Sequence, residues 1–252
     1  MKSKLIIISI FIFLKTFATG QEPNFIKING EEYQLLNDPL EKYFKEHPEN
    51  HPVYGEKFIK KNEEGEEPLI KISTGNWRGY VAYFEIKDNK LFLTDLKIED
   101  DDSEKQISIF NKIFSEKSVA LDYSGILTVP NGDFIDSDNF GFSSYYSSYF
   151  VLTIKNDHVE KMKELKNKDY MKFKFRQFQE YQKTKEYKAE YEKYIKSNRE
   201  SKKMDLSPQF TKGLSKEEIK RIKKRYAEKP TKDEIDGFLF MMSNLEQIYV
   251  DY

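Results

Sequence analysis

The amino-acid sequence predicts an α+β fold, in which a mostly antiparallel sheet of about six to eight strands packs against two helices. Residues 21–165 hold short runs of alternating large and polar residues separated by tight turns, a pattern typical of antiparallel strands. From residue 166 the spacing becomes helical, which predicts a helical C-terminal arm. Aromatic residues make up 15% of the chain and charged residues 34%, so a packed core is expected despite the high charge.

Residues 1–20 predict a secretory signal. A short basic start precedes the apolar run Leu5–Leu14, and Ala18 and Gly20 occupy the small-residue positions before a cleavage site. The run is shorter than the roughly 20 residues of a membrane span, although an uncleaved anchor helix or a buried strand are the alternatives. We expect cleavage near Gly20–Gln21, export to the periplasm or the medium, and a soluble mature chain with no transmembrane span.

The mature chain is expected to carry its positive and negative charges in different regions. The formal net charge of −1 becomes −4 when the three lysines of residues 1–20 are removed. Lys172–Lys229 carries 19 Lys and Arg against 9 Asp and Glu, a net charge of +10, which leaves −14 on the other mature residues. We therefore divide the chain into a signal (1–20), an acidic α+β domain (21–165) and a basic helical C-terminal region (166–252).

Each predicted element begins or ends at a recognisable signal. Alternating runs flank Asn29-Gly30, the strongest short hairpin signal. Asp38 is placed to cap a short helix that starts at Pro39, with Glu41 three residues after the cap. The apolar face of that helix is predicted to hold Leu40, Tyr43 and Phe44. Residues 47–68 are polar and rich in Pro and Gly, which predicts a long surface loop.

Trp77–Lys87 and Lys90–Ile98 alternate on either side of Asp88-Asn89, which predicts a second hairpin. Large apolar residues fall on both faces, so this hairpin is expected to be central and covered on both sides. Regular alternation would place Arg78 and Tyr80 on one face and Glu85 on the other.

The remaining elements follow in order. Residues 99–103 predict the start of a helix with the apolar stripe Ile107, Phe110, Ile113 and Phe114. A strand then ends at Pro130-Asn131-Gly132, and residues 133–148 suggest a long aromatic loop. A last hairpin pairs 149–154 with 159–165, and Asp169–Ile195 reads as one long helix. A polar linker, 197–212, precedes two helices that open with the capping boxes Ser215…Glu218 and Thr231…Glu234.

Several chemistries are poorly supported. With no cysteine in the chain, disulfides, thiolate metal sites, cysteine nucleophiles and cysteine lipidation are excluded. His47 and His51 are four residues apart, but Pro48 and Pro52 keep that segment from presenting both on one helix, and we interpret both as surface residues. His158 lies in a predicted turn, where we expect it to be exposed.

Acidic and catalytic motifs are equally weak. Asp133, Asp136 and Asp138 fall in one loop, but Phe140 and Ser147 occupy positions where a calcium loop needs ligands. The sequence contains neither a Gly-x-Ser-x-Gly nucleophile motif nor a glycine-rich phosphate loop. We assign no catalytic residue, metal ligand or cofactor.

Two groups of residues are candidate binding sites. The first is a pocket beside the Trp77 strand, formed by Trp77, Arg78, Tyr80, Glu85 and Asp95. The second is the basic arm, represented by Lys220, Arg221, Lys223, Lys224 and Arg225. A solvated helix face is the simplest interpretation of the arm. Contact with the acidic N-terminal body of the same chain, or with a partner such as a protein or an anionic envelope surface, is the functional interpretation. Nucleic acid is not expected as a partner of an exported chain.

Two segments, WRGYVAYFEIKDNKLFLTDLKIE and YSGILTVPNGDFIDSDNFGFSSYYSSYFVLTIKND, carry a resemblance. They resemble a family of uncharacterised bacterial proteins with a Trp-Arg-Gly-Tyr strand and a Gly-x-Leu-x-x-Pro-x-Gly strand end, over roughly residues 24 to 182. The matching positions are Trp77, Arg78, Gly79, Tyr80, Glu85, Gly125, Pro130, Gly132, Gly141 and Tyr145. The family has Ala-Thr-Trp-Glu where this chain has Ala82-Tyr83-Phe84-Glu85, and a His near Asn139 that is missing here. The resemblance implies an architecture and no activity.

The sequence therefore predicts an exported, non-catalytic protein that binds an unknown macromolecule in the cell envelope. The alternative is an enzyme of unrecognised type, such as a hydrolase that uses Glu85 with Arg78 or Tyr80 nearby.

Overall fold

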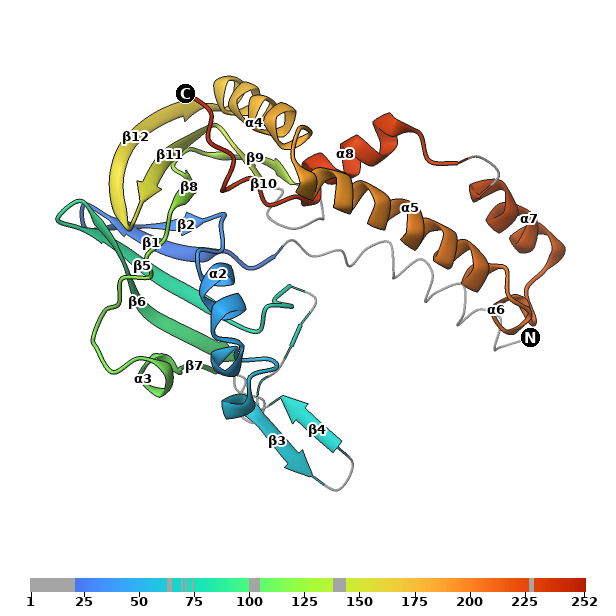
Figure 1. Ribbon diagram of the computed structural model, residues 1–252, viewed down its shortest axis with the longest axis horizontal. Helices are drawn as coiled ribbons and strands as arrows, with labels where there is room; N and C mark the ends of the chain where they lie inside the picture. Colours follow the sequence, from blue (N-terminus) through green and yellow to red (C-terminus); the bar gives the residue numbers. More distant parts are fainter. Residues whose placement is uncertain are drawn as a thin grey trace. The chain divides into compact units, whose positions relative to one another are not determined.

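The chain folds into two units, one built around an eight-stranded sheet and the other made of helices (Figure 1). The computed structural model describes residues 21–62, 65–68, 70, 72–73, 75–99, 105–137, 144–226 and 229–252. The first unit ends at Lys174 and also contains Glu246–Tyr252, and the second is Phe175–Leu245. This arrangement confirms the α+β class with a helical C-terminal region. The predicted signal, residues 1–20, lies outside the described residues.

The main sheet is mostly antiparallel. Its strands are β1 (Asn24–Ile28), β2 (Glu31–Leu35), β5 (Val81–Lys87), β6 (Lys90–Glu99), β7 (Gln106–Ser108), β8 (Gly125–Pro130), β11 (Ser148–Lys155) and β12 (His158–Lys166). Their order is β2-β1-β5-β6-β12-β11-β8, with β7 also paired to β6. The neighbours β1 and β5 run parallel, and the other pairs are antiparallel.

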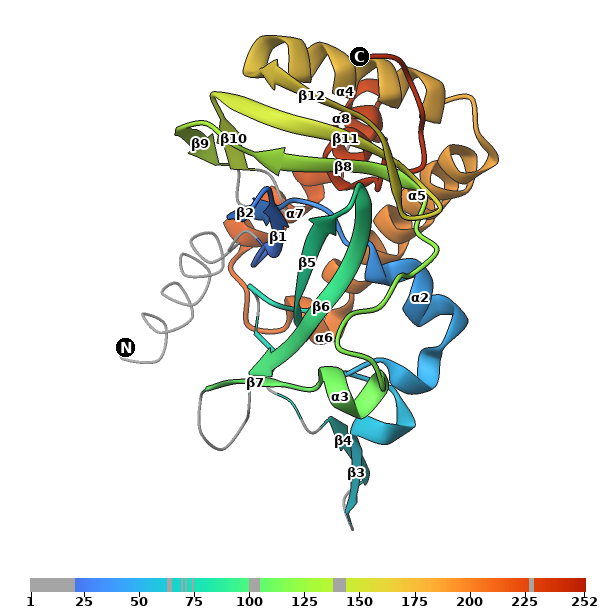
Figure 2. The same cartoon turned by 90° about the vertical axis from the view of Figure 1, so that its left-hand side faces the viewer.

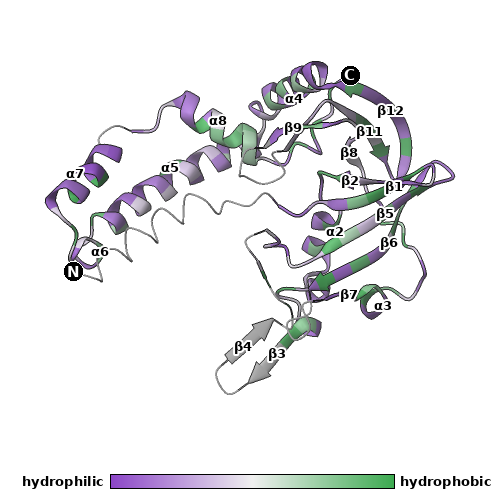
Figure 3. Ribbon diagram, turned by 180° about the vertical axis from the view of Figure 1, so that it is seen from behind, coloured by the Kyte–Doolittle hydropathy of each residue, from purple (hydrophilic) through white to green (hydrophobic). Residues whose placement is uncertain are grey.

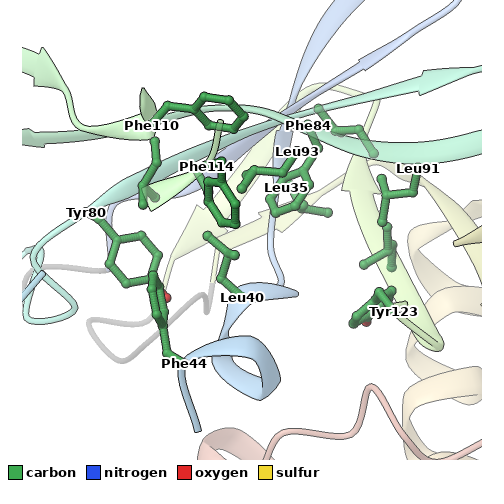
Figure 4. Close-up of a cluster of buried hydrophobic side chains, with 14 of the residues drawn as sticks. Leu35, Leu40, Phe44, Tyr80, Phe84, Leu91, Leu93, Phe110, Phe114 and Tyr123 are labelled. Carbon is green, nitrogen blue, oxygen red and sulfur yellow. The ribbon is translucent and has the colours of Figure 1, made fainter. Parts of the chain in front are cut away.

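The sheet curves until its two edges meet (Figure 2). The amide of Leu36, just after β2, donates a hydrogen bond of 3.0 Å to the carbonyl of Thr128 in β8. At the opposite side, β6 and β12 join at their turn ends, where His158 pairs with Lys90. The enclosed core contains Leu35, Leu40, Phe44, Tyr80, Phe84, Leu91, Leu93, Phe110, Phe114 and Tyr123, among other residues (Figure 4).

The first hairpin forms as predicted. Asn29 and Gly30 have φ values of 52° and 89°, the left-handed conformations that a type I′ turn requires. Helix α2 (Leu40–Glu46) then buries Leu40 and Phe44. The prediction that Asp38 caps this helix was wrong, because α2 has no side-chain cap and the Asp38 carboxylate accepts a hydrogen bond from the Tyr80 hydroxyl instead.

The second hairpin differs from the prediction in two ways. Its first strand begins at Val81, because the residues from Asn76 to Gly79 form a turn in which the Gly79 amide donates to the Asn76 carbonyl at 3.1 Å and Gly79 has a φ of 74°. A bulge at Thr94 then shifts the phase of β6, so Leu91 and Leu93 face the core together with Leu96 and Ile98. The opposite face of the hairpin stays half-exposed, and the prediction of cover on both sides was wrong here.

Cover on both sides is found instead on β8 and β11. Leu127 and Leu152 face the main core, whereas Ile126, Tyr149 and Val151 belong to a second cluster with Tyr170 and Phe173. The last two residues lie on α4 (Asn167–Tyr181), so this helix covers the outer face of these strands. Every residue of β8 is consequently buried.

Several predicted loops contain regular structure. Residues 47–68 form the short helical turns η1 (Pro48–Asn50) and η2 (Glu56–Phe58) and the strands β3 (Ile59–Asn62) and β4 (Gly65–Pro68). The predicted aromatic loop forms β9 (Phe134–Ser137) and β10 (Ser144–Tyr146). The helix expected after residue 103 is replaced by β7 and the short α3 (Phe110–Ile113), which leaves Ile107 exposed.

The second unit corrects the prediction of one long helix followed by a polar linker. The chain breaks between α4 and α5 (Lys185–Asp205), because the Thr184 hydroxyl accepts the Tyr187 amide and caps a new helix. Helix α5 then continues through most of the predicted linker, and α6 (Pro208–Thr211) follows it. The break allows the rings of Phe178, Tyr181 and Tyr187 to pack edge to face.

Helices α7 (Lys216–Arg225) and α8 (Lys232–Met242) begin as predicted. Both capping boxes are complete, with reciprocal hydrogen bonds between Ser215 and Glu218 and between Thr231 and Glu234. In α8, Ile235 and Leu239 are buried, while Phe238 is exposed. Among the described residues, no helix is sufficiently long and apolar to cross a membrane.

Candidate functional site

Arg78 and Tyr80 meet at Asp38, inside the first unit. The Tyr80 hydroxyl donates a 2.8 Å hydrogen bond to Oδ2 of Asp38, and Nη1 of Arg78 lies 3.7 Å from the same oxygen. The Arg78 guanidinium carbon is 5.5 Å from the centre of the Tyr80 ring. Arg78 is only 5% exposed and Tyr80 only 2%, so these polar groups are buried rather than presented on a surface.

Burial dominates the electrostatics of this group. It raises the pKa of the Asp38 carboxyl, while the positive charge of Arg78 and the Tyr80 hydroxyl act in the opposite direction. Burial, followed by the negative charge of Asp38, raises the pKa of Tyr80 well above 10. Tyr80 therefore remains a hydrogen-bond donor across the physiological pH range.

Arg78 also holds the start of the described chain. Its Nη2 donates to the carbonyl of Glu22 at 2.5 Å, and the side-chain Nδ2 of Asn76 donates to the Glu22 carboxylate at 3.3 Å. These contacts fix the segment that leads into β1. The arrangement is that of a structural polar network, in which each charged group is buried with its partner.

A second buried network closes the sheet where β2 meets β8. Glu246 accepts hydrogen bonds from the Asn37 side chain at 2.9 Å and from the Asp38 amide at 3.0 Å. Its other carboxylate oxygen accepts one from the Tyr123 hydroxyl at 3.0 Å. Burial raises the pKa of Glu246 to about 7. Residues 246–252 thus return to the first unit and insert a carboxyl group into its seam.

Sequence reasoning missed this seam, because its members are far apart in the chain. Asn37 and Glu246 are separated by 209 positions, and neither forms part of a local motif. The nearest local signal is Asp38, whose position before Pro39 predicts a helix cap and gives no indication of a contact with Glu246. Asp157 was missed for the same reason: its carboxylate accepts the amides of Asp122 and Tyr123 at 2.8 and 2.9 Å.

His51 is buried, at 9% exposure, which corrects its assignment as a surface residue. The turns η1 and η2 fold it against Phe44 and Tyr80, and its ring stacks on Tyr54 with centroids 3.7 Å apart. Its Nδ1 accepts the Val53 amide at 3.1 Å. Burial lowers the pKa of His51 to about 4, so the ring is neutral at pH 7. His158 is exposed, as predicted.

The predicted pocket beside the Trp77 strand does not form as one group. Trp77 is 65% exposed, whereas Arg78 and Tyr80 point inward. Glu85 lies on the outer, half-exposed face of β5, and Asp95 lies opposite Tyr83 on the same face. The structure therefore brings Arg78 and Tyr80 together and separates them from Glu85 and Asp95.

The outer face of this hairpin is already occupied by its own side chains. Tyr83 stacks on Phe25 at 5.2 Å, and the Lys97 ammonium lies 4.2 Å from the centre of the Tyr83 ring. Asp95 accepts a 2.6 Å hydrogen bond from the Ser108 hydroxyl. These contacts occupy the Tyr83 ring and the Asp95 carboxylate, so this face presents neither group to a ligand.

No group of three His, Asp or Glu residues among those described could hold a metal ion. Asp138, one of the three aspartates of the weak calcium motif, lies outside the described residues.

The basic arm forms a single exposed surface. Lys220, Arg221, Lys223, Lys224 and Arg225 all lie on α7 and are all exposed. No residue of α7 is buried, and Ile219 and Ile222 are half-buried on the side away from most of the cations. Figure 3 shows α7 as a largely hydrophilic helix.

Contacts at its C-terminal end hold α7 against α5. The hydroxyl of Tyr226 donates a 2.7 Å hydrogen bond to Asp205, and Lys202 donates to the carbonyl of Tyr226 at 3.0 Å. Arg225 lies 3.8 Å from the same aspartate and remains 65% exposed. The basic helix is thus fixed in orientation while most of its cations remain in solvent.

Comparison with known proteins gives no relative from which a role could be transferred: no protein-family model, no curated protein and no solved structure matches the chain.

Proposed function

We propose that this chain is a non-catalytic binding protein, active after export, that engages an anionic partner through the basic face of α7. The observation that carries the proposal is the exposure of all five predicted cations on one helix. Like charges held close together by a folded scaffold create a local potential that attracts anions and speeds their association. The proposal of export rests on the predicted signal at residues 1–20.

The pattern of ion pairs in the helical unit supports binding by α7 over a purely solubilising role. Ion pairs neutralise part of the charge elsewhere in this unit: Lys183, in the turn after α4, lies 2.6 Å from Glu180, and Lys193 lies 3.3 Å from Glu190 within α5. Among the described residues, Lys220, Lys223 and Lys224 form no such pair. Their charge is therefore free to act on a partner.

An enzyme is less well supported. Arg78 and Tyr80 are buried and bound to Asp38 and Glu22, and Glu85 lies on the opposite face of its strand. A hydrolase that uses these groups together would require a different arrangement of the hairpin.

The test is salt-dependent binding to a soluble polyanion. Fluorescent polyglutamate is titrated against residues 21–252, which contain every described helix and strand, and against the variant Lys220→Ala/Lys223→Ala/Lys224→Ala. We expect affinity that falls with salt and a smaller salt slope in the variant. The control Lys163→Ala/Lys166→Ala/Lys168→Ala changes the same charge at exposed positions of the first unit. Equal loss in both variants, or binding that does not depend on salt, would overturn the proposal.

A further inference from the structure

We infer that the anionic partner of α7 is a lipid bilayer surface, into which the end of the helical unit inserts apolar side chains. This inference rests on the proposed function and names its partner. The region concerned is the basic tip, defined as residues 196–225, which contains the end of α5, the short α6 and α7.

The basic tip concentrates positive charge. It carries 11 Lys and Arg against 4 Asp and Glu, a net charge of +7. A negatively charged leaflet attracts such a cluster over a distance of about one Debye length, roughly 8 Å at physiological ionic strength. The basic residues of the tip therefore supply the long-range part of membrane binding.

The same tip exposes two large apolar side chains. Met204, in the last turn of α5, is 61% exposed, and Phe210, in α6, is 42% exposed. Ser207 caps α6 by accepting the Phe210 amide at 3.3 Å, which fixes the turn between them. Apolar side chains surrounded by cations match the boundary between lipid headgroups and acyl chains, where the side chains enter hydrocarbon and the cations meet phosphates.

The two features are held next to each other. Asp205, the neighbour of Met204, accepts the Tyr226 hydroxyl at the end of α7 and lies near Arg225. At the other end of α7, the chain passes from α6 to Ser215 within four residues of Thr211. Both ends of α7 are thus tied to the segment that exposes Met204 and Phe210 (Figure 1).

A bilayer fits these observations better than a soluble polyanion does. A soluble polyanion whose groups are carboxylates or phosphates alone would pair with the cations but would leave Met204 and Phe210 without an apolar partner. The tip contains too few consecutive apolar residues to span a membrane, so the expected contact is interfacial and reversible.

The test is sedimentation of residues 21–252 with vesicles of phosphatidylcholine alone and of phosphatidylcholine mixed with phosphatidylglycerol. Residues 1–20 are left out because their apolar run could itself bind lipid. We expect binding only to the anionic vesicles. The variant Lys220→Ala/Lys223→Ala/Lys224→Ala should bind about 100-fold more weakly, since each basic residue near an anionic surface contributes about fivefold.

A second variant tests insertion separately. Met204→Ser/Phe210→Ser should weaken vesicle binding roughly tenfold, by loss of apolar contact with the bilayer, and should leave polyglutamate binding unchanged. The matched control is Met241→Ser/Phe175→Ser, which changes the same residue types at exposed positions of the same unit outside the tip. Circular dichroism checks that both variants keep their helices.

The outcomes separate this inference from the proposed function. Binding to polyglutamate without binding to anionic vesicles would overturn the bilayer and leave an anionic partner in place. Vesicle binding that is unchanged by Met204→Ser/Phe210→Ser would overturn insertion. Absence of binding to both would overturn the proposed function itself.

Discussion

Replacing Glu246 with Gln should prevent the first unit from losing stability as the pH rises. The carboxyl group is buried in the seam between Asn37 and Tyr123, and burial raises its pKa to about 7, from an ordinary value of 4.5. The folded chain therefore holds the proton more tightly than the unfolded chain does. The free energy of unfolding must then fall as the pH rises from 4.5 to about 7, and remain low above that.

The size of the effect follows from the two pKa values. Their difference corresponds to about 3 kcal/mol of unfolding free energy, lost between pH 4.5 and pH 8. In Glu246→Gln the side chain is neutral at every pH, and its amide oxygen can still accept the hydrogen bonds from Asn37 and Asp38. The difference in unfolding free energy between the variant and the natural protein should therefore grow by about 3 kcal/mol, in favour of the variant, as the pH rises from 4.5 to 8.

Urea denaturation at a series of pH values measures this difference. Because Trp77, the only tryptophan in the chain, is already 65% exposed, unfolding is followed by far-ultraviolet circular dichroism. Glu32→Gln, at an exposed position of β2, controls for loss of a carboxylate as such. Subtracting the natural protein from the variant removes the contributions of other titrating groups. A difference that stays constant from pH 4.5 to 8 would refute the argument for burial of Glu246.

Three further predictions concern the first unit. Burial lowers the pKa of His51 from 6.5 to about 4. The unfolding free energy of the protein should therefore fall by about 2–3 kcal/mol as the pH drops from 6.5 to 4 and this ring becomes protonated; an NMR titration of the ring with a midpoint near 6.5 would contradict this. Gly79→Ala should lower the melting temperature more than Gly30→Ala, since both residues have positive φ but only at Gly79 would a new Cβ meet other side chains; equal shifts would show that packing there is tolerant. Tyr80→Phe removes the hydroxyl bound to Asp38 and should lower the unfolding free energy by about 1.5–3 kcal/mol, which an unchanged urea midpoint would exclude.

Local signals in the sequence were sufficient where one short segment determines the geometry. The turn at Asn29-Gly30 requires left-handed backbone, and both capping boxes satisfy helix ends within four residues. These elements formed at the predicted positions. The change from strand to helical spacing near residue 166 predicted the fold class for the same reason.

Predictions failed where the deciding contact is remote or where one residue shifts the pattern. The bulge at Thr94 reverses the phase of β6, so Leu96 faces the core together with Leu93, whereas simple alternation along the strand places these two residues on opposite faces. The buried position of Arg78 depends on Asp38 and Glu22, neither of which lies near it in the sequence. The sequence could identify Arg78 and Tyr80 as unusual residues, but only tertiary structure distinguishes a structural network from a binding pocket.

The return of residues 246–252 to the first unit also has a consequence for the order in which the protein folds. The contact between Asn37 and Glu246 spans 209 positions, and the ribosome must synthesise the whole of Phe175–Leu245 before it can form. At roughly 5–20 residues per second, that takes several seconds. During this interval the seam between β2 and β8 lacks its carboxyl group, and the Asn37 side chain and the Tyr123 hydroxyl lack an acceptor that they use in the folded state. The nascent sheet therefore lacks the Glu246 carboxyl group at this edge during the time in which a chaperone would meet the emerging chain.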